Sequence, residues 1–153
     1  MSPKARFVLI LAVVFLADRF SKWNILDHYK EGQGFALIRG ILHVTRVNNA
    51  GAAFGIFQGA GFWLIAVSMI FIVVFGIYFL KNTASFKPAV FYAAPLIVAG
   101  ALGNLFDRVR YGYVVDFIDL RVWPVFNIAD ASICVGMGLI MLSLLKRRFA
   151  ENT

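Results

Sequence analysis

Acidic residues are scarce in this chain, and they are unevenly placed. The 153 residues include 15 Lys and Arg but only eight Asp and Glu, and no acid stands between Glu31 and Asp107. Charged residues make up 15% of the chain and hydrophobic residues 61%, whereas a soluble domain is about 25% charged. The length allows one domain, whose core cannot hide so much apolar surface, so lipid is the expected solvent.

Cysteine is almost absent as well, and the single Cys134 excludes an internal disulfide. It stands in an apolar run and is interpreted as a packing residue. The net charge of +7 does not predict nucleic-acid binding here. The basic residues stand at the ends of apolar segments and in loops, where they meet anionic headgroups and set orientation.

Four long apolar segments predict a mainly α, polytopic membrane protein with four transmembrane helices. The segments cover about residues 7–26, 62–80, 88–106 and 128–145. Each has roughly 18–20 residues, which at about 1.5 Å per residue is enough to cross the hydrocarbon core. Lipid offers the backbone no hydrogen-bond partners, so these spans are expected to be helices rather than strands.

The basic residues also predict the orientation. Four spans place both termini and the loop 81–87 on one side, which carries seven basic residues and one acid. The rest of the chain has eight basic residues and seven acids. The excess of positive charge therefore places both termini in the cytoplasm, and residues 27–61 and 107–127 face outward.

The two outer segments differ in composition. The first is rich in glycine and contains a β-branched stretch at residues 41–47, which predicts a small extracytoplasmic β-cradle within about residues 28–59. The second has its own apolar pieces and is expected to be a short loop or helix segment that dips back toward the bilayer.

Asp116 and Asp130 each stand at the edge of an apolar run, close to the expected membrane surface. The fourth span begins near the level where the third ends, so its first turn returns to Asp116. Two carboxylates in one such site cannot both ionise cheaply, and they share a proton. The pair can activate a water: one carboxylate accepts its proton while the other donates to a carbonyl oxygen.

A structural alternative stays open for each acid. Asp130 follows Asn127 by three residues, as a helix N-terminal acid follows an N-cap. Asp116 fits a solvated loop acid. Only their expected proximity favours chemistry.

Polar residues around the two acids can support them. Asn104 and Asn127 can orient carboxylates or a peptide carbonyl without adding charge. Arg108 stands four residues after Asn104 and shares its helix face, where it can hold a carbonyl or an oxyanion. Snorkelling to the interface is the alternative for Arg108, and Asp107 is interpreted as a structural acid that pairs with a nearby arginine.

Three further residues complete the set of candidates. Asp18 and Lys22 stand four apart on the first span, and an ion pair between them is interpreted as structural. Asn49 opens a segment of small residues and can bond an extended peptide.

Five short motifs, taken together, closely resemble the lipoprotein signal peptidases of bacteria, also called signal peptidase II. In order they are Asp18-x-x-x-Lys22, Asn49-x-Gly-Ala-Ala-Phe54, Gly103-Asn-x-x-Asp-Arg108, Val114-Val-Asp-Phe117 and Phe126-Asn-x-Ala-Asp130. Each motif is weak alone, but all five at these spacings are specific and cover nearly the whole chain. Two small departures are Ala99-Gly100, where the family often has paired glycines, and Arg19, which replaces no catalytic residue.

The resemblance implies an aspartic endopeptidase of the bacterial cytoplasmic membrane, without metal or cofactor, and a target of globomycin. It would remove the signal peptide of prolipoproteins by cutting before a cysteine that already carries diacylglycerol. Asp116 and Asp130 would be the catalytic pair at the outer face. The substrate-binding and supporting residues would be Asn49, Asn104, Arg108, Asn127, Asp18, Lys22 and Asp107. The β-cradle would clamp the substrate, membrane lipids would surround the protein, and a monomer would suffice.

Two other functions are compatible with the residues. A small proton-coupled four-span transporter would use Asp18 or Asp130 as its proton site, although the acids cluster at one face rather than at the midplane, where transport sites usually lie. A non-catalytic membrane assembly factor would need neither acid.

Overall fold

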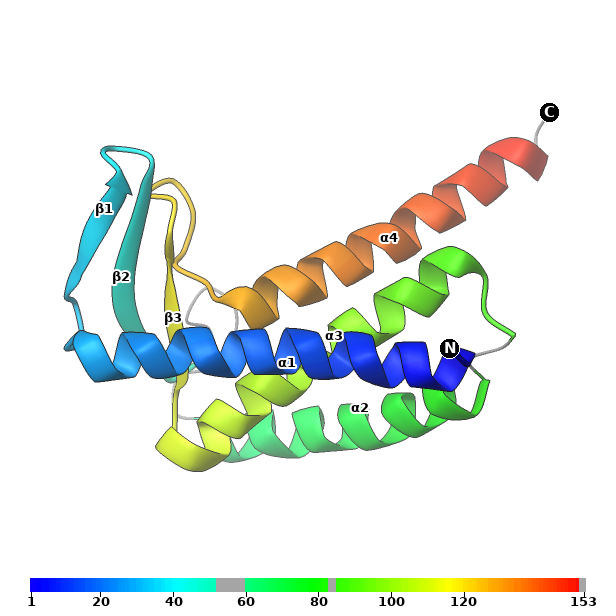
Figure 1. Cartoon of the computed structure of the whole chain (residues 1–153), viewed down its shortest axis with the longest axis horizontal. Helices are drawn as coiled ribbons and strands as arrows, with labels where there is room; N and C mark the ends of the chain where they lie inside the picture. The colour runs from blue at the N-terminus through cyan, green and yellow to red at the C-terminus, as the bar shows by residue number, and fades with distance from the viewer. Residues whose placement is uncertain (52–59, 83–84, 152–153) are drawn as a thin grey trace.

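The computed structural model describes residues 1–51, 60–82 and 85–151, which form helices and one small sheet (Figure 1). The helices are α1 (Pro3–His28), α2 (Gly61–Asn82), α3 (Pro88–Tyr111) and α4 (Ile128–Glu151). The strands are β1 (Gly34–Ile38), β2 (Leu42–Asn49) and β3 (Val114–Asp119). The sheet lies at one end of the helices, and both termini lie at the other (Figure 1).

All four predicted apolar segments lie within helices, and each helix is longer than its apolar segment. Within the described part of the chain, α2, α3 and residues Ile128–Arg148 of α4 are long and apolar enough to cross a membrane. Large apolar side chains on α2, such as Trp63 and Ile70, are mostly exposed, as expected where lipid covers a helix. α1 carries Asp18, Arg19 and Lys22 in its second half and is not among these candidate spans.

The sheet is antiparallel, with strand order β1-β2-β3. β1 and β2 lie within the predicted β-cradle. The second outer segment, however, is wrongly predicted as a loop or helix, because its residues 114–119 form β3 and pair with β2. In this register Asp116 stands opposite Val47. The alternation typical of a half-exposed strand is missing, since Val114, Val115 and Phe117 are all buried.

A tight turn leads the chain from α3 into the sheet. Gly112 has a φ of 81°, and its N–H donates to the carbonyl of Arg108, which ends α3. This left-handed conformation favours glycine. The turn places β3 against the end of α1, where Ile25, Val115 and Phe117 form an apolar cluster.

Small residues let α3 and α4 approach each other closely. A side chain at Gly100 would collide with the Ala129 carbonyl and with Ser132 Oγ. Ala99, the departure noted above, is completely buried. The close packing holds the first turn of α4 beside α3 and faces it toward β3.

Candidate active site

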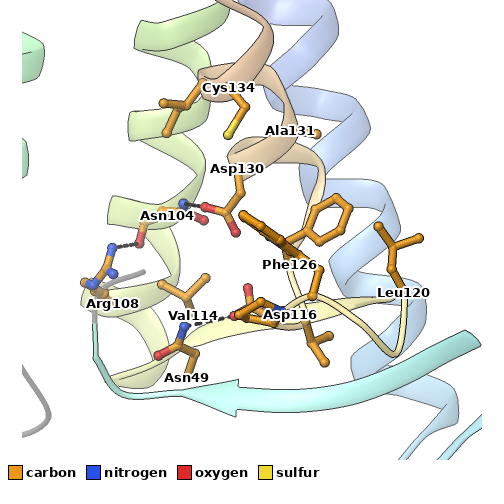
Figure 2. A pocket seen from close by; sticks show the side chains of 14 residues that line it. Asn49, Asn104, Arg108, Val114, Asp116, Leu120, Phe126, Asp130, Ala131 and Cys134 are labelled. Atoms are coloured by element: carbon orange, nitrogen blue, oxygen red, sulfur yellow. Dashed lines mark hydrogen bonds between the residues drawn. The ribbon is translucent and has the colours of Figure 1, made fainter. Parts of the chain in front are cut away.

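Asp116 and Asp130 line one cavity of about 500 Å³, although they come from different elements (Figure 2). Asp116 lies on β3 and Asp130 lies in the first turn of α4. The polar lining also includes Asn49, Asn104 and Arg108. The remaining walls are mainly apolar and come from β3, α4 and the connection between them: Val114, Leu120, Trp123, Pro124, Val125, Phe126, Ala131, Ile133 and Cys134.

Asp116 is buried, with 2% of its surface exposed, so its interpretation as a solvated loop acid is wrong. Asn49 Nδ2 donates to its Oδ2 at 3.0 Å, and Asn127 Nδ2 donates to its Oδ1 at 2.6 Å. Burial and then the charge of Asp130 raise the pKa of Asp116 to about 7, although the two amides and Lys22 oppose the rise. Near neutral pH this carboxyl is therefore partly protonated.

The structure confirms the alternative in which Asp130 and Asn127 cap a helix. The Asp130 side chain also lines the cavity. Asn127 Oδ1 accepts from the Asp130 N–H at 2.9 Å, while the Asn127 N–H donates to Asp130 Oδ2 at 3.3 Å. This reciprocal pattern caps α4. Asn104 Nδ2 donates to the other oxygen, Asp130 Oδ1, at 2.7 Å. The cap thus fixes the carboxylate at the cavity wall.

Asn127 links the two acids. Besides capping α4 and donating to Asp116, its Nδ2 lies 3.2 Å from Asn104 Oδ1. Asn104 Oδ1 also accepts from Lys22 Nζ at 3.0 Å. The two predicted asparagines therefore join both carboxylates to a cation on α1.

Arg108 lies at the edge of the cavity rather than snorkelling away. Its Nη2 donates to the Gly51 carbonyl at 2.9 Å and its Nη1 to the Asn104 carbonyl at 3.4 Å (Figure 2). Its Nε is buried and has no hydrogen-bond partner among the described residues. Arg108 therefore anchors the chain just after Asn49, and the rest of that motif, residues 52–54, lies outside the described residues.

Asp18, Lys22 and Asp107 lie together outside the cavity lining. Arg19 is a fourth member of this group. Lys22 Nζ lies 3.1 Å from Asp18 Oδ2 and 2.8 Å from Asp107 Oδ2. Arg19 Nη2 lies 2.6 Å from Asp18 Oδ2, and Nη1 lies 2.6 Å from Asp107 Oδ1. We call these four residues the ion cluster; its two acids and two cations balance.

The ion cluster confirms the predicted Asp18–Lys22 pair. It also shows that the arginine paired with Asp107 is Arg19. Sequence reasoning missed Arg19 because its partner Asp107 is 88 positions away. The cluster also weakens the transporter hypothesis. Asp18 is completely buried and forms ion pairs with Arg19 and Lys22, so its side chain lies out of contact with solvent.

Comparisons with known proteins match most of the chain to one family. A family model described as signal peptidase (SPase) II matches residues 10–146. The chain is 40% identical over 136 residues to the lipoprotein signal peptidase of Halothermothrix orenii, covering 89% of this chain and 92% of that one. It is 42% identical over 149 residues to that of Syntrophomonas wolfei, covering 96% and 98%.

The fold is similar to a solved structure described as a bacterial membrane enzyme, obtained by the in meso method at 2.3 Å resolution. The TM-score is 0.86 at 37% sequence identity, and the match covers 93% of this chain and 88% of that chain.

Proposed function

Because this chain belongs to the signal peptidase II family, we propose that it is an aspartic endopeptidase that matures lipoproteins. It removes the signal peptide from diacylglyceryl-modified prolipoproteins by cutting before the lipidated cysteine. One observation carries the proposal: Asp116 and Asp130 line the same cavity, and the Asn127 side chain donates to the Asp116 carboxylate and accepts from the Asp130 N–H.

The two carboxyls divide the acid and base roles. Asp130 stands at the N-terminus of α4, where the helix dipole favours the ionised form. Asp116, with its pKa raised to about 7, keeps a proton near neutral pH. Asp130 takes a proton from water as the water oxygen attacks the scissile carbonyl carbon, and Asp116 donates its proton to the carbonyl oxygen. As the tetrahedral intermediate collapses, one of its hydroxyls returns a proton to Asp116, the C–N bond breaks, and the amine leaves with the proton from Asp130.

The other cavity residues bind the substrate. Asn49 and Arg108 lie at the cavity edge with amide and guanidinium groups that suit a peptide backbone or a developing oxyanion. The apolar walls suit the lipid chains and the signal peptide. The sheet acts as the β-cradle that clamps the substrate, and one copy of the chain suffices.

Four spans with cytoplasmic termini bring the site to the outer face of the cytoplasmic membrane. The location of both termini at the end opposite the sheet supports an even number of crossings (Figure 1). The charges of α1 do not prevent it from spanning, because Asp18 and Lys22 are 0% and 1% exposed and paired inside the protein.

Cleavage of a lipid-modified precursor by the purified protein tests the proposal. The precursor is offered with and without its diacylglyceryl group, and mass spectrometry locates the cut. Asp116→Asn and Asp130→Asn should each lower turnover by about 10²–10⁴-fold. Asp27→Asn, at an exposed position at the end of α1, should leave turnover unchanged.

Thermal unfolding in detergent confirms that each variant is folded. A folded Asp116→Asn or Asp130→Asn enzyme with normal turnover would contradict the catalytic pair. Equal cleavage of the unmodified precursor would contradict the lipid requirement.

A further inference from the structure

The ion cluster contacts the backbone immediately before each proposed catalytic acid. Asp18 Oδ1 accepts from the N–H of Ala129 at 3.0 Å, one residue before Asp130. Asp107 Oδ2 accepts from the N–H of Val115 at 3.1 Å, one residue before Asp116. The two buried carboxylates therefore hold two peptide units, one in α4 and one in β3.

Arg19 joins these two carboxylates through a single planar group. Its Nη1 and Nη2 each lie 2.6 Å from one of them, and Nη2 also donates to the Gly103 carbonyl at 3.1 Å. The guanidinium lies over the ring of Phe106, 4.7 Å from its centroid. A rigid fork held in place by a ring and a carbonyl sets the separation of the two acids it binds.

Gly103 makes this approach possible. A side chain there would place its Cβ 2.6 Å from Asp18 Oδ2 and 3.2 Å from the Ala129 side chain. α1, α3 and α4 therefore meet at the ion cluster with no room for even a methyl group.

We propose that Arg19 is a positioning residue for the catalytic pair. Through Asp18 and Asp107 it fixes the peptide N–H groups of Ala129 and Val115, one residue before Asp130 and Asp116, and so it sets the separation of the two carboxyls. Among the described residues, the cavity lining does not include Arg19, and the hydrogen bonds of its Nη atoms go to Asp18, Asp107 and Gly103. The inference rests on the proposed function for its kinetic consequence, but not for its structural one.

Arg19→Lys and Arg19→Gln separate charge from geometry. Lysine keeps the positive charge but loses the fork that binds two carboxylates at once, whereas glutamine loses both. Arg110→Lys and Arg110→Gln are the matched controls, because Arg110 is an exposed arginine near the end of α3 that lies over the ring of Tyr111.

Two measurements on each purified full-length variant test the proposal. Hydrogen exchange, followed by mass spectrometry, should be about tenfold or more faster in peptides covering residues 114–119 and 128–131 of Arg19→Lys, with the rest of each helix unchanged. Steady-state cleavage of the lipid-modified precursor should show kcat lowered about 10–100-fold. KM should stay within about threefold, because the cavity lining is untouched.

The outcomes are distinct. An Arg19→Lys protein with parental exchange in both peptides, or with parental kcat, overturns the proposal. Faster exchange along all helices, with kcat per folded molecule preserved, shows a merely structural role and also overturns it. If the parent protein cleaves no precursor, the proposed function fails, while hydrogen exchange still decides whether Arg19 fixes the two peptide units.

Discussion

Replacing Asp116 by asparagine should change the pH dependence of stability as well as activity. The folded protein holds the proton of this buried carboxyl up to a pKa of about 7, whereas the ordinary value is 3.8. Between these values the folded state binds more protons than the unfolded state. Stability is therefore lost as pH rises through this window, and the loss amounts to about 4 kcal/mol.

Asparagine cannot ionise, so Asp116→Asn escapes this loss but introduces a different one. The amides of Asn49 and Asn127 donate to the two oxygens of Asp116, and an asparagine side chain offers only one oxygen. One donor then loses its acceptor, which costs about 1–3 kcal/mol at any pH. The variant should be the less stable protein at pH 4 and the more stable one at pH 8.

Thermal unfolding in one detergent at both pH values measures this crossover. The Tm of the variant relative to the parent should rise by roughly 10 °C from pH 4 to pH 8. Groups that titrate alike in both proteins cancel in this comparison, and Asp27→Asn serves as the exposed control. A Tm difference that is the same at both pH values would refute the argument that burial raises the pKa of Asp116.

Two further predictions concern the packing behind the cavity. Lys22→Met should destabilise the protein by about 3–5 kcal/mol, because buried acids at Asp18 and Asp107 lose a shared cation; a Tm within 2 °C of the parent would contradict this. Gly103→Ala should lower both Tm and turnover, since its Cβ would lie 2.6 Å from Asp18 Oδ2. Gly138→Ala, where a Cβ meets open space, should instead raise Tm slightly, and equal effects of the two alanines would contradict the packing argument.

The helices were predictable from the sequence because lipid imposes a minimum length and excludes charge. The start of the fourth apolar segment places Asp130 in the first turn of a helix. Its spacing from Asn127 predicted the cap that the structure contains. The apolar segments and the cap depend only on residues a few positions apart in the chain, so the sequence is enough to predict them.

The strand that carries Asp116 was not predictable in the same way. Its valines and phenylalanine are all buried, so the run lacks the alternation that identifies a half-exposed strand. Only pairing with β2, more than sixty residues earlier in the chain, makes it a strand. Arg19 was missed for a related reason, because its partner Asp107 belongs to another helix.

Burial alone does not separate the structural acids of this protein from the proposed catalytic ones. Asp18, Asp107 and Asp116 are almost equally buried, at 0%, 0% and 2% exposed. The first two each contact the cations of both Arg19 and Lys22, so their charge is compensated inside the protein. Asp116 instead receives two neutral amides and faces a second carboxylate across a cavity. Its charge is therefore costly and its pKa lies near 7, as the proposed proton transfer to a substrate requires. In a membrane protein with so few acids, the partners of each carboxyl thus distinguish the acids that hold the structure together from the acid proposed to perform chemistry.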